Sequence, residues 1–295
     1  MTTTGFTVLD GGMGRELMRI GAPFRQPEWS ALALLEGPEW VVTAHRNFID
    51  AGAQVITTNS YAVVPFHIGD ERFAARGREL AALSGVLARE AAADTGVVVA
   101  GSLPPLFGSY RPDLFDAAAA ASVIDPLVDG LASNVDVWLG ETLGSIAEAV
   151  AVREAIDRAG SSLPLWVSYT LDDGVPGVLR SGEPVAGAVA RAIDLGATVV
   201  SFNCCQAETI SASLDTAVRV AAGRARIGAY ANRFVSSHTG SGEANAQLSA
   251  FRDDLDPVAY GDFVHRWIEA GVEVVGGCCG MEPAHVAHLA ALAGR

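Results

Sequence analysis

The sequence predicts an α/β fold, a single (β/α)8 TIM barrel that forms one domain over residues 1–295. Two observations lead to this prediction. Short apolar runs rich in β-branched residues alternate with longer segments of helical period, and eight such cycles follow one another. Polar residues and cysteines gather at the carboxyl ends of the short runs, which meet at one mouth in a barrel. An open, doubly wound sheet is the competing fold, but it would spread these residues along an edge.

The short runs are apolar along their whole length. Parallel strands that are covered on both faces have this composition, because neither face meets water. Glycine closes several of the intervening helical segments just before the next run, as at Gly52 and Gly196. The predicted strands are Phe6–Asp10, Gln54–Ser60, Val97–Leu103, Val135–Glu141, Leu165–Thr170, Thr198–Cys204, Ile227–Ala231 and Glu273–Gly277.

The longer segments begin with helix-start signals. Pro38 and Pro283 lie in first turns, and Asp256-Pro257 has the form of a cap followed by a first helical residue. The predicted helices span residues 38–51, 71–94, 116–133, 145–159, 184–195, 207–223, 257–270 and 282–293. Two longer irregular stretches, 104–113 and 236–256, follow the third and the seventh strand, and loops of this length are often functional.

The charge balance excludes polyanionic partners. Asp and Glu number 34 against 20 Lys and Arg, for a net charge of −14, so nucleic acid and anionic membrane surfaces would be repelled. The start of the chain has neither the basic nor the apolar region of a secretory signal, and no apolar span is long enough for a membrane helix. We expect a cytoplasmic protein that acts on small molecules, with no nucleic acid and no membrane as partner; the sequence predicts no oligomeric state.

All four cysteines follow apolar runs, at the ends of the sixth and eighth predicted strands. A barrel separates these strands by only one other, so the two pairs can share a metal ion. Catalytic zinc is typically held by three protein ligands and keeps a fourth position open. Glycines around Cys278 and Cys279 allow both thiols to turn toward one ion. Successive strand residues face opposite ways, so one of Cys204 and Cys205 is expected as the third ligand, and this rule leaves open which one.

Other interpretations of the cysteines are buried free thiols, which behave as small hydrophobic groups, and a closed structural zinc site with four thiolates. The adjacent pairs differ from the Cys-x-x-Cys pairs of zinc fingers. A disulfide framework is excluded, because four cysteines are few for this length and a bridge between neighbours is strained.

Several segments carry a resemblance to a known family. The most specific are Asn203-Cys204 and Gly276-Gly-Cys-Cys-Gly280. They are accompanied by Leu9-Asp-Gly-Gly-Met-Gly-Arg-Glu-Leu17, Trp29-Ser-Ala31, Ala51-Gly-Ala-Gln-Val-Ile-Thr-Thr-Asn-Ser-Tyr61 and Glu141-Thr142. Together these segments resemble the homocysteine S-methyltransferase family over nearly the whole chain.

The resemblance implies a zinc ion (Zn2+) held by Cys204, Cys278 and Cys279, with Cys205 as a non-ligand. It implies methyl transfer from an onium donor to the thiol of L-homocysteine, which gives methionine. S-methylmethionine or S-adenosylmethionine is the favoured donor, because the chain is short and carries no appended cobalamin or folate domain. The alternatives are betaine or a dimethylsulfonio acid as donor, another small thiol or selenol as acceptor, and a non-enzymatic barrel that binds zinc or thiols.

The resemblance also implies substrate-binding roles. Glu141 is expected to bind the amino group of homocysteine, and Asp10 with the backbone of Gly11 and Gly12 to shape the amino-acid pocket. Asn203 joins this set as support rather than as a direct participant. Glu141 as a cap of the following helix and Asp10 as a structural hydrogen bonder are the plainer alternatives. Aromatic candidates for a wall around the donor cation are Trp29, Tyr61, Trp138, Tyr169 and Tyr230.

The sequence departs from the family pattern after two strands. Residues 230–234 read Tyr-Ala-Asn-Arg-Phe, which places the cation of Arg233 where the family commonly has Tyr-Pro-Asn-Ser-Gly. Residues 104–112 also differ from the usual Gly-Pro-Tyr-Gly type. Both stretches are expected near the mouth, so they bear on the identity of the donor.

Overall fold

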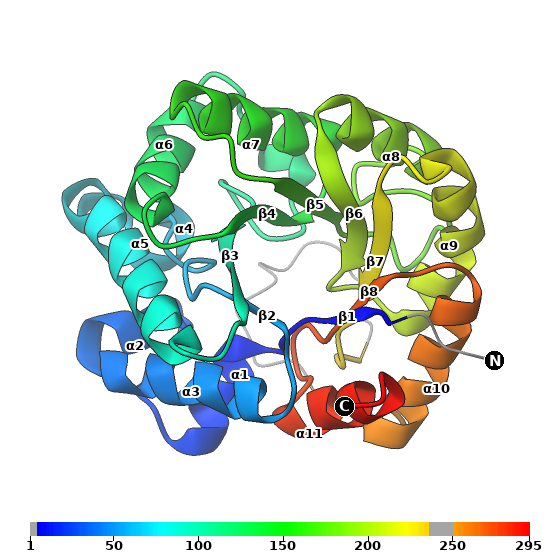
Figure 1. Cartoon of the computed structure of the whole chain (residues 1–295). Helices are drawn as coiled ribbons and strands as arrows, with labels where there is room; N and C mark the ends of the chain where they lie inside the picture. Colours follow the sequence, from blue (N-terminus) through cyan, green and yellow to red (C-terminus); the bar gives the residue numbers. More distant parts are fainter. Residues whose placement is uncertain (1–4, 236–249) are drawn as a thin grey trace.

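The computed structural model describes residues 5–235 and 250–295. Eight parallel strands form one sheet in the order β1-β8-β7-β6-β5-β4-β3-β2, with helices around them (Figure 1). A parallel bridge between Leu9 and Val55 joins the two ends of this order, and the N–H of Asp10 donates to the carbonyl oxygen of Val55 at 3.0 Å. The ring of strands is thereby closed, so the predicted (β/α)8 barrel is confirmed and the open sheet is wrong.

All eight predicted strands exist, but several are shorter than expected. The first and last each lose one residue at the start and two at the end. The strands are β1 (Thr7–Val8), β2 (Val55–Thr57), β3 (Val98–Leu103), β4 (Val137–Leu143), β5 (Leu165–Tyr169), β6 (Ala197–Asn203), β7 (Arg226–Tyr230) and β8 (Val274–Val275).

The eight predicted helices also exist, with ends within a few residues of the expected ones. They are α3 (Pro38–Asp50), α5 (Asp70–Ala92), α6 (Ala120–Leu131), α7 (Ile146–Arg158), α8 (Val185–Asp194), α9 (Ala207–Ala221), α10 (Pro257–Glu269) and α11 (Pro283–Leu292). Within the described parts of the chain, none of the helices is long and apolar enough to cross a membrane.

Four short helical segments were not predicted. A strict alternation of one strand and one helix leaves no place for them, since they lie inside the connections between strands and their helices. They are α1 (Met13–Ile20), α2 (Ala31–Glu36), α4 (Pro65–Ile68) and the 3-10 turn η1 (Pro112–Leu114). Most of the predicted loop 236–256 lies outside the described residues.

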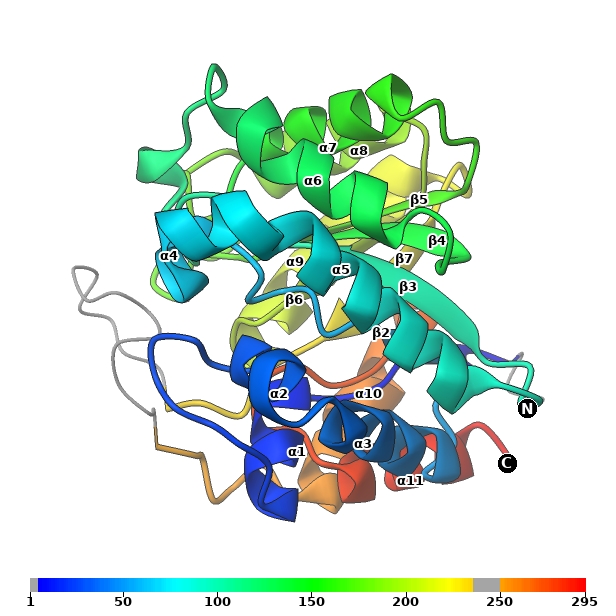
Figure 2. The same ribbon diagram turned by 90° about the vertical axis from the view of Figure 1, so that its left-hand side faces the viewer.

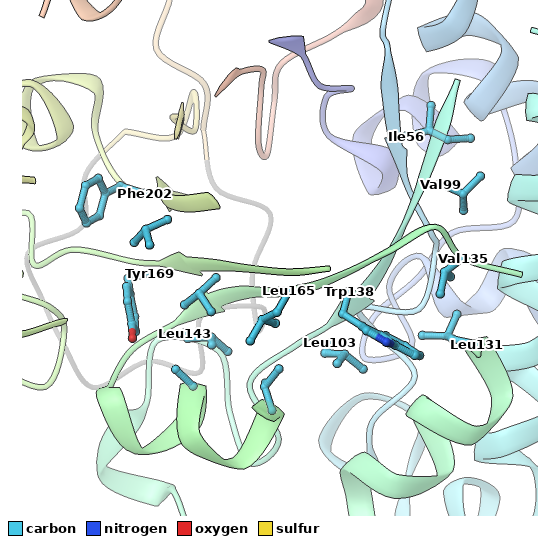
Figure 3. Packing of buried hydrophobic residues seen from close by; sticks show 14 of the residues in the cluster. Ile56, Val99, Leu103, Leu131, Val135, Trp138, Leu143, Leu165, Tyr169 and Phe202 are labelled. Atoms are coloured by element: carbon cyan, nitrogen blue, oxygen red, sulfur yellow. The ribbon is translucent and has the colours of Figure 1, made fainter. Parts of the chain in front are cut away.

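Side chains inside the barrel alternate with side chains that face the helices. On β4, Val137 and Leu139 belong to the inner cluster, whereas Trp138 packs outward with residues such as Leu103, Leu131 and Val135 (Figure 3). This alternation of period two directs Glu141, two residues after Leu139, toward the barrel axis at the mouth. Figure 2 shows the start of the described chain and the C-terminus on the same side of the barrel.

Closure of the barrel depends on a close approach at Gly276. A Cβ atom added there would lie 2.5 Å from the Cβ of Leu9 and 3.1 Å from the carbonyl oxygen of Asp10. We expect Gly276→Ala to push β8 away from the start of the chain and to lower the free energy of unfolding by about 1–3 kcal/mol, as overpacking does. Urea unfolding measures this loss.

The matched control is Gly187→Ala on α8, where an added Cβ would meet nothing within 4 Å. Alanine is the better helix former, so this change should raise stability by about 0.5–1 kcal/mol. Equal stability of the two variants would contradict the steric role of Gly276.

Candidate metal centre and substrate pocket

The structure brings three of the four cysteines together at the mouth of the barrel. The Sγ atoms of Cys204, Cys278 and Cys279 all lie within 4.8 Å of one another, and those of Cys204 and Cys279 are 3.6 Å apart. Cys204 follows β6 and the other two follow β8, with β7 between the two strands. The expectation that the two strand ends meet across one intervening strand is confirmed.

Cys205 lies apart from this cluster. Its side chain is fully buried in the hydrophobic core outside the inner barrel, where burial raises the pKa of its thiol. The backbone of Cys204 has a φ of 54°, a left-handed conformation that ends β6 and sends the two neighbouring side chains to different places. The structure thus brings the sulfur of Cys204, and not that of Cys205, into the cluster.

A tight turn holds the other two thiols. The N–H of Met281 donates to the carbonyl oxygen of Cys278 at 3.0 Å, and Gly280 has a φ of 84°, the positive value that a type II turn requires at its third position. Gly12 faces this turn: a Cβ added to it would lie 2.9 Å from the carbonyl oxygen of Cys278. Glycine therefore serves both to shape the turn and to let α1 approach it.

Polar donors reach two of the sulfur atoms. The hydroxyl of Tyr110 donates to the Sγ of Cys204 at 2.9 Å, and the Nδ2 of Asn203 donates to the Sγ of Cys278 at 3.7 Å. Hydrogen bonds from Cys278 and Cys279, together with that from Tyr110, lower the pKa of Cys204 well below its usual value. The same interactions with Cys204 raise the pKa of Cys278 and of Cys279. Without a metal ion, the three thiol groups therefore favour a single thiolate, at Cys204.

The arrangement of sulfur atoms suits a zinc ion. Zinc binds thiolate sulfur at about 2.3 Å in tetrahedral geometry, which separates two sulfur ligands by about 3.8 Å. The separation of 3.6 Å between the sulfurs of Cys204 and Cys279 is close to this value, and Cys278 lies within the same 4.8 Å limit. A soft cation of charge +2 would also remove the electrostatic obstacle to a second and a third thiolate.

Two buried carboxyl groups lie in the same pocket. Glu141 at the mouth end of β4 receives a hydrogen bond of 2.5 Å from the hydroxyl of Ser102. Asp10 receives the N–H of Thr57 at 2.7 Å and its hydroxyl at 3.1 Å. Burial raises the pKa of Glu141 to about 8 and that of Asp10 to about 7. Asp10 therefore makes the hydrogen bonds expected of a structural residue, whereas only one oxygen of Glu141 accepts a bond within the described part of the chain.

Asn203 stands behind the pocket wall rather than in it. Its Oδ1 accepts hydrogen bonds from the N–H of Thr142 at 2.9 Å and from the hydroxyl of Ser168 at 2.8 Å. Its Nδ2 donates to the hydroxyl oxygen of Thr142 at 2.8 Å and to the Sγ of Cys278. These bonds tie the ends of β4 and β5 to the cysteine turn.

The pocket above the three sulfurs is lined by most of the predicted residues. Of the aromatic candidates, Trp29, Tyr61 and Tyr230 line it, whereas Trp138 and Tyr169 are buried in the outer core. The predicted residues in the lining are Asp10, Gly11, Gly12, Glu141, Cys204, Cys278 and Cys279, and others are Met13, Gly14, Arg15, Thr57, Asn59 and Tyr110.

Sequence reasoning missed Tyr110 and Arg15. Tyr110 belongs to the irregular stretch 104–113, which was predicted as functional from its length alone. Arg15 lies in the unpredicted helix α1, with its guanidinium 4.5 Å from the ring centroid of Phe251. Arg233 lies next to the cysteine turn near the mouth, as expected, since its N–H donates to the carbonyl oxygen of Cys279 at 2.8 Å. Its side chain donates to the carbonyl oxygen of Arg252 at 2.9 Å and is not part of the pocket lining. These contacts join residues that are far apart in the sequence, and the sequence pattern does not indicate them.

A closed (β/α)8 barrel that holds three thiols and two buried carboxyl groups at its mouth defines a class of protein: a barrel with a thiolate metal site inside a small-molecule pocket. The sequence places the chain within that class. The family model described as homocysteine S-methyltransferase matches residues 7–293. The chain belongs to the homocysteine S-methyltransferase family, and the expectation of an enzyme, an S-methyltransferase, is confirmed.

Individual relatives agree with this assignment. The chain is 29% identical to the homocysteine S-methyltransferase of Escherichia coli, over 96% of this chain and 94% of that protein. It is 26% identical to a selenocysteine Se-methyltransferase of Brassica oleracea, over 95% and 87%. A methionine synthase of Mycobacterium tuberculosis is 28% identical over 96% of this chain but only 24% of its own length.

Solved structures show the same fold. The metallated form of the homocysteine methyltransferase MmuM from Escherichia coli superimposes with a TM-score of 0.79 at 27% identity and covers 98% of this chain and 96% of its own. Its oxidized form gives a TM-score of 0.80, also at 27% identity, over 97% and 96%.

The buried carboxyl group of Glu141 predicts a pH dependence of stability. In the folded, metal-free protein its pKa is raised from 4.5 to about 8, so between these values the folded chain retains a proton that the unfolded chain releases. The free energy of unfolding then falls as pH rises from about 5 to about 8, by at most about 1.4 kcal/mol per pH unit for one group. Burial raises the pKa of Asp10 and of Glu148 to about 7, and they contribute to the same fall. Glu141→Gln should therefore reduce this dependence in urea unfolding without abolishing it.

Glu39→Gln, at the exposed start of α3, is the control and should leave the slope as it is. If Glu141→Gln kept the slope of the unchanged chain, the raised pKa of Glu141 would be contradicted.

Proposed function

We propose that this enzyme transfers a methyl group from an onium donor to the thiol of L-homocysteine with the help of zinc, and so forms methionine. The observation that carries the proposal is the cluster of three thiols at the base of a pocket that also contains two buried carboxyl groups. The names of the relatives in Zea mays and Escherichia coli, both homocysteine S-methyltransferases, support the acceptor. The metallated form of MmuM supports a metal.

The ligands in this proposal are Cys204, Cys278 and Cys279, and Asn203 orients the second of them. Bound zinc supplies one piece of chemistry: it keeps the acceptor thiol deprotonated at neutral pH, whereas a free thiol has a pKa of about 8.5. All four cysteines are free, and reduced sulfur is what the site requires. This supports the proposal that the enzyme works in the cytoplasm, where disulfides are rare.

The acceptor's amino-acid group fits the two sides of the pocket. Its ammonium group pairs with Glu141, because an adjacent positive charge favours the ionised carboxylate and lowers the pKa that burial raises. Its carboxylate fits the start of α1, where Gly12 offers no side-chain cap and the first N–H groups of a helix attract anions. Asp10, fixed by Thr57, holds the strand from which Gly11 and Gly12 depart.

Aromatic residues of the pocket hold the donor in this proposal. Trp29, Tyr61 and Tyr230 line it, and aromatic faces attract a sulfonium or ammonium group. The remaining contribution of the chain is positioning, which brings the methyl carbon in line with the acceptor sulfur. S-methylmethionine or S-adenosylmethionine is the donor we propose, with betaine or a dimethylsulfonio acid as the alternative.

A selenol acceptor is the second candidate. Relatives from Brassica oleracea and Astragalus bisulcatus are named as methyltransferases of selenocysteine, and each aligns with at least 94% of this chain. A selenol ionises more readily than a thiol and would use the same pocket, so a comparison of kcat/KM for homocysteine and selenocysteine decides between the two acceptors.

Loss of one proposed ligand tests the metal. We expect Cys279→Ala to lose its zinc and to lower methionine formation by more than the roughly 10- to 100-fold that loss of an outer-shell partner costs. Metal analysis and methionine formation from homocysteine measure this, with S-methylmethionine, S-adenosylmethionine, betaine and a dimethylsulfonio acid as donors. Cys205→Ala changes a cysteine outside the cluster and should keep both properties. Undiminished activity of Cys279→Ala, or of the enzyme stripped of metal, would defeat the mechanism.

The role of Glu141 is tested with two acceptors. Glu141→Gln should raise the KM for homocysteine by about 10- to 100-fold, since a hydrogen bond to a charged group is worth about 1.5–3 kcal/mol. With 4-mercaptobutanoate, which lacks the amino group, the variant should behave like the unchanged enzyme. A similar loss with both acceptors would indicate that Glu141 acts on the pocket's structure instead.

A further inference from the structure

Tyr110 contacts the cysteine cluster from a loop that the fold does not require. It lies in the connection between β3 and α6, with a left-handed backbone φ of 61°. Such a conformation costs a residue other than glycine about 1–2 kcal/mol, so the surrounding contacts must hold it. In this position its hydroxyl reaches the Sγ of Cys204 at 2.9 Å.

Two neighbouring contacts fix the position of Tyr110. On the preceding residue, the hydroxyl of Ser109 shares a hydrogen bond of 2.8 Å with that of Tyr61, which anchors the loop to the connection after β2. The guanidinium of Arg180 lies 5.0 Å from the centroid of the Tyr110 ring, and Arg180 in turn pairs with Asp173 at 3.3 Å. A cation near the ring draws electron density from it, so the hydroxyl becomes a stronger donor.

Asp173 links this group back to β6. Its Oδ1 accepts the N–H of Gln206 at 2.9 Å and the hydroxyl of Thr209 at 2.8 Å, at the start of α9. Arg180 and Asp173 thus connect the ring of Tyr110, on the loop after β3, to the segment that follows Cys204. Its hydroxyl is aimed at one sulfur by contacts that do not involve that sulfur.

The contact bears on a side reaction of the proposed methyl transfer, the methylation of Cys204. A methyl donor in this pocket lies near the acceptor sulfur and near the cysteine sulfurs as well. Attack by the sulfur of Cys204 would form a new S–C bond to the methyl group and break the methyl bond of the sulfonium. The electron pair would leave with the donor's thioether, and Cys204 would become a neutral S-methyl thioether that binds zinc poorly. Such an enzyme would inactivate itself.

We propose that Tyr110 is a positioning residue that holds Cys204 in the cluster and, through the hydrogen bond to its sulfur, keeps the methyl group from being transferred to this cysteine. A hydrogen bond to a thiolate withdraws charge from the lone pair that would attack. The acceptor sulfur receives no such bond from Tyr110 and stays the more reactive one. This inference rests on the proposed zinc-dependent methyl transfer.

The test compares the zinc-loaded enzyme with its Tyr110→Phe variant in the absence of an acceptor. Each is treated with methyl iodide, which needs no donor pocket, and with S-methylmethionine. Peptide mass spectrometry then measures S-methylation of Cys204. We expect at least a tenfold faster reaction in the variant, because a hydrogen bond to a charged group is worth about 1.5–3 kcal/mol and about 1.4 kcal/mol is a factor of ten.

A second measurement reports the bond without any reaction. With cobalt(II) in place of zinc, the sulfur-to-metal charge-transfer absorption depends on the electron density of the ligand sulfur, so Tyr110→Phe should shift it to longer wavelength. Asp116→Asn changes an exposed residue of the same connection and keeps both contacts of Tyr110, so it is the control and should resemble the unchanged enzyme in both measurements.

Arg180→Gln keeps the hydroxyl of Tyr110 and removes the cation near its ring. In both measurements it should fall between the unchanged enzyme and Tyr110→Phe. This variant carries the test if Tyr110→Phe does not fold. Equal methylation of Cys204 and an equal absorption band in all the folded variants would overturn the role of Tyr110 while the unchanged enzyme still binds zinc and makes methionine. An unchanged enzyme that holds no zinc and uses no onium donor would overturn the proposed function itself.

Discussion

The pairing of β1 with β8 is the constraint on which the site depends. The N–H of Leu9 donates to the carbonyl oxygen of Val275 at 2.7 Å, and the N–H of Gly277 donates to that of Asp10 at 2.9 Å. These bonds fix the cysteine turn against the start of the chain, while β7 sets its distance from β6. Two sulfurs separated by 75 residues in sequence thereby come within 3.6 Å of each other.

The pocket concentrates acidic groups that cannot all ionise together. Burial raises the pKa of Asp10 and Glu141, and the bonds around Cys204 raise that of Cys278 and Cys279. Each of these shifts favours the neutral form, so the pocket alone disfavours further negative charge. A divalent metal and an ammonium group are the two kinds of cation that would relieve this, one at the sulfurs and one at the carboxylates. The electrostatics and the proposed substrates therefore support each other.

One part of the pocket is formed by strand ends and the other part by loops. The side with the cysteines, Asp10 and Glu141 is built from strand ends, whose positions follow from barrel geometry. The other side comes from the connections that carry Trp29, Tyr61 and Tyr110, and the sequence departs from the family pattern in the loop after β3. The wall that we propose to meet the donor is thus the part with the greatest freedom to differ, so the family supports the acceptor more directly than it supports the donor.

The sequence by itself determined the number and order of the strands and of the eight helices that alternate with them, because buried parallel strands and amphipathic helices leave clear apolar patterns. It also determined which residues stand at strand ends, including Glu141 and the four cysteines. Only the tertiary structure decided that Cys204 rather than Cys205 joins the cluster, through a left-handed backbone that no period of two describes. It also placed Tyr110 against Cys204, excluded Trp138 and Tyr169 from the pocket, and revealed α1. These features depend on contacts between distant segments and on local turns, and neither leaves a periodic signal in the chain.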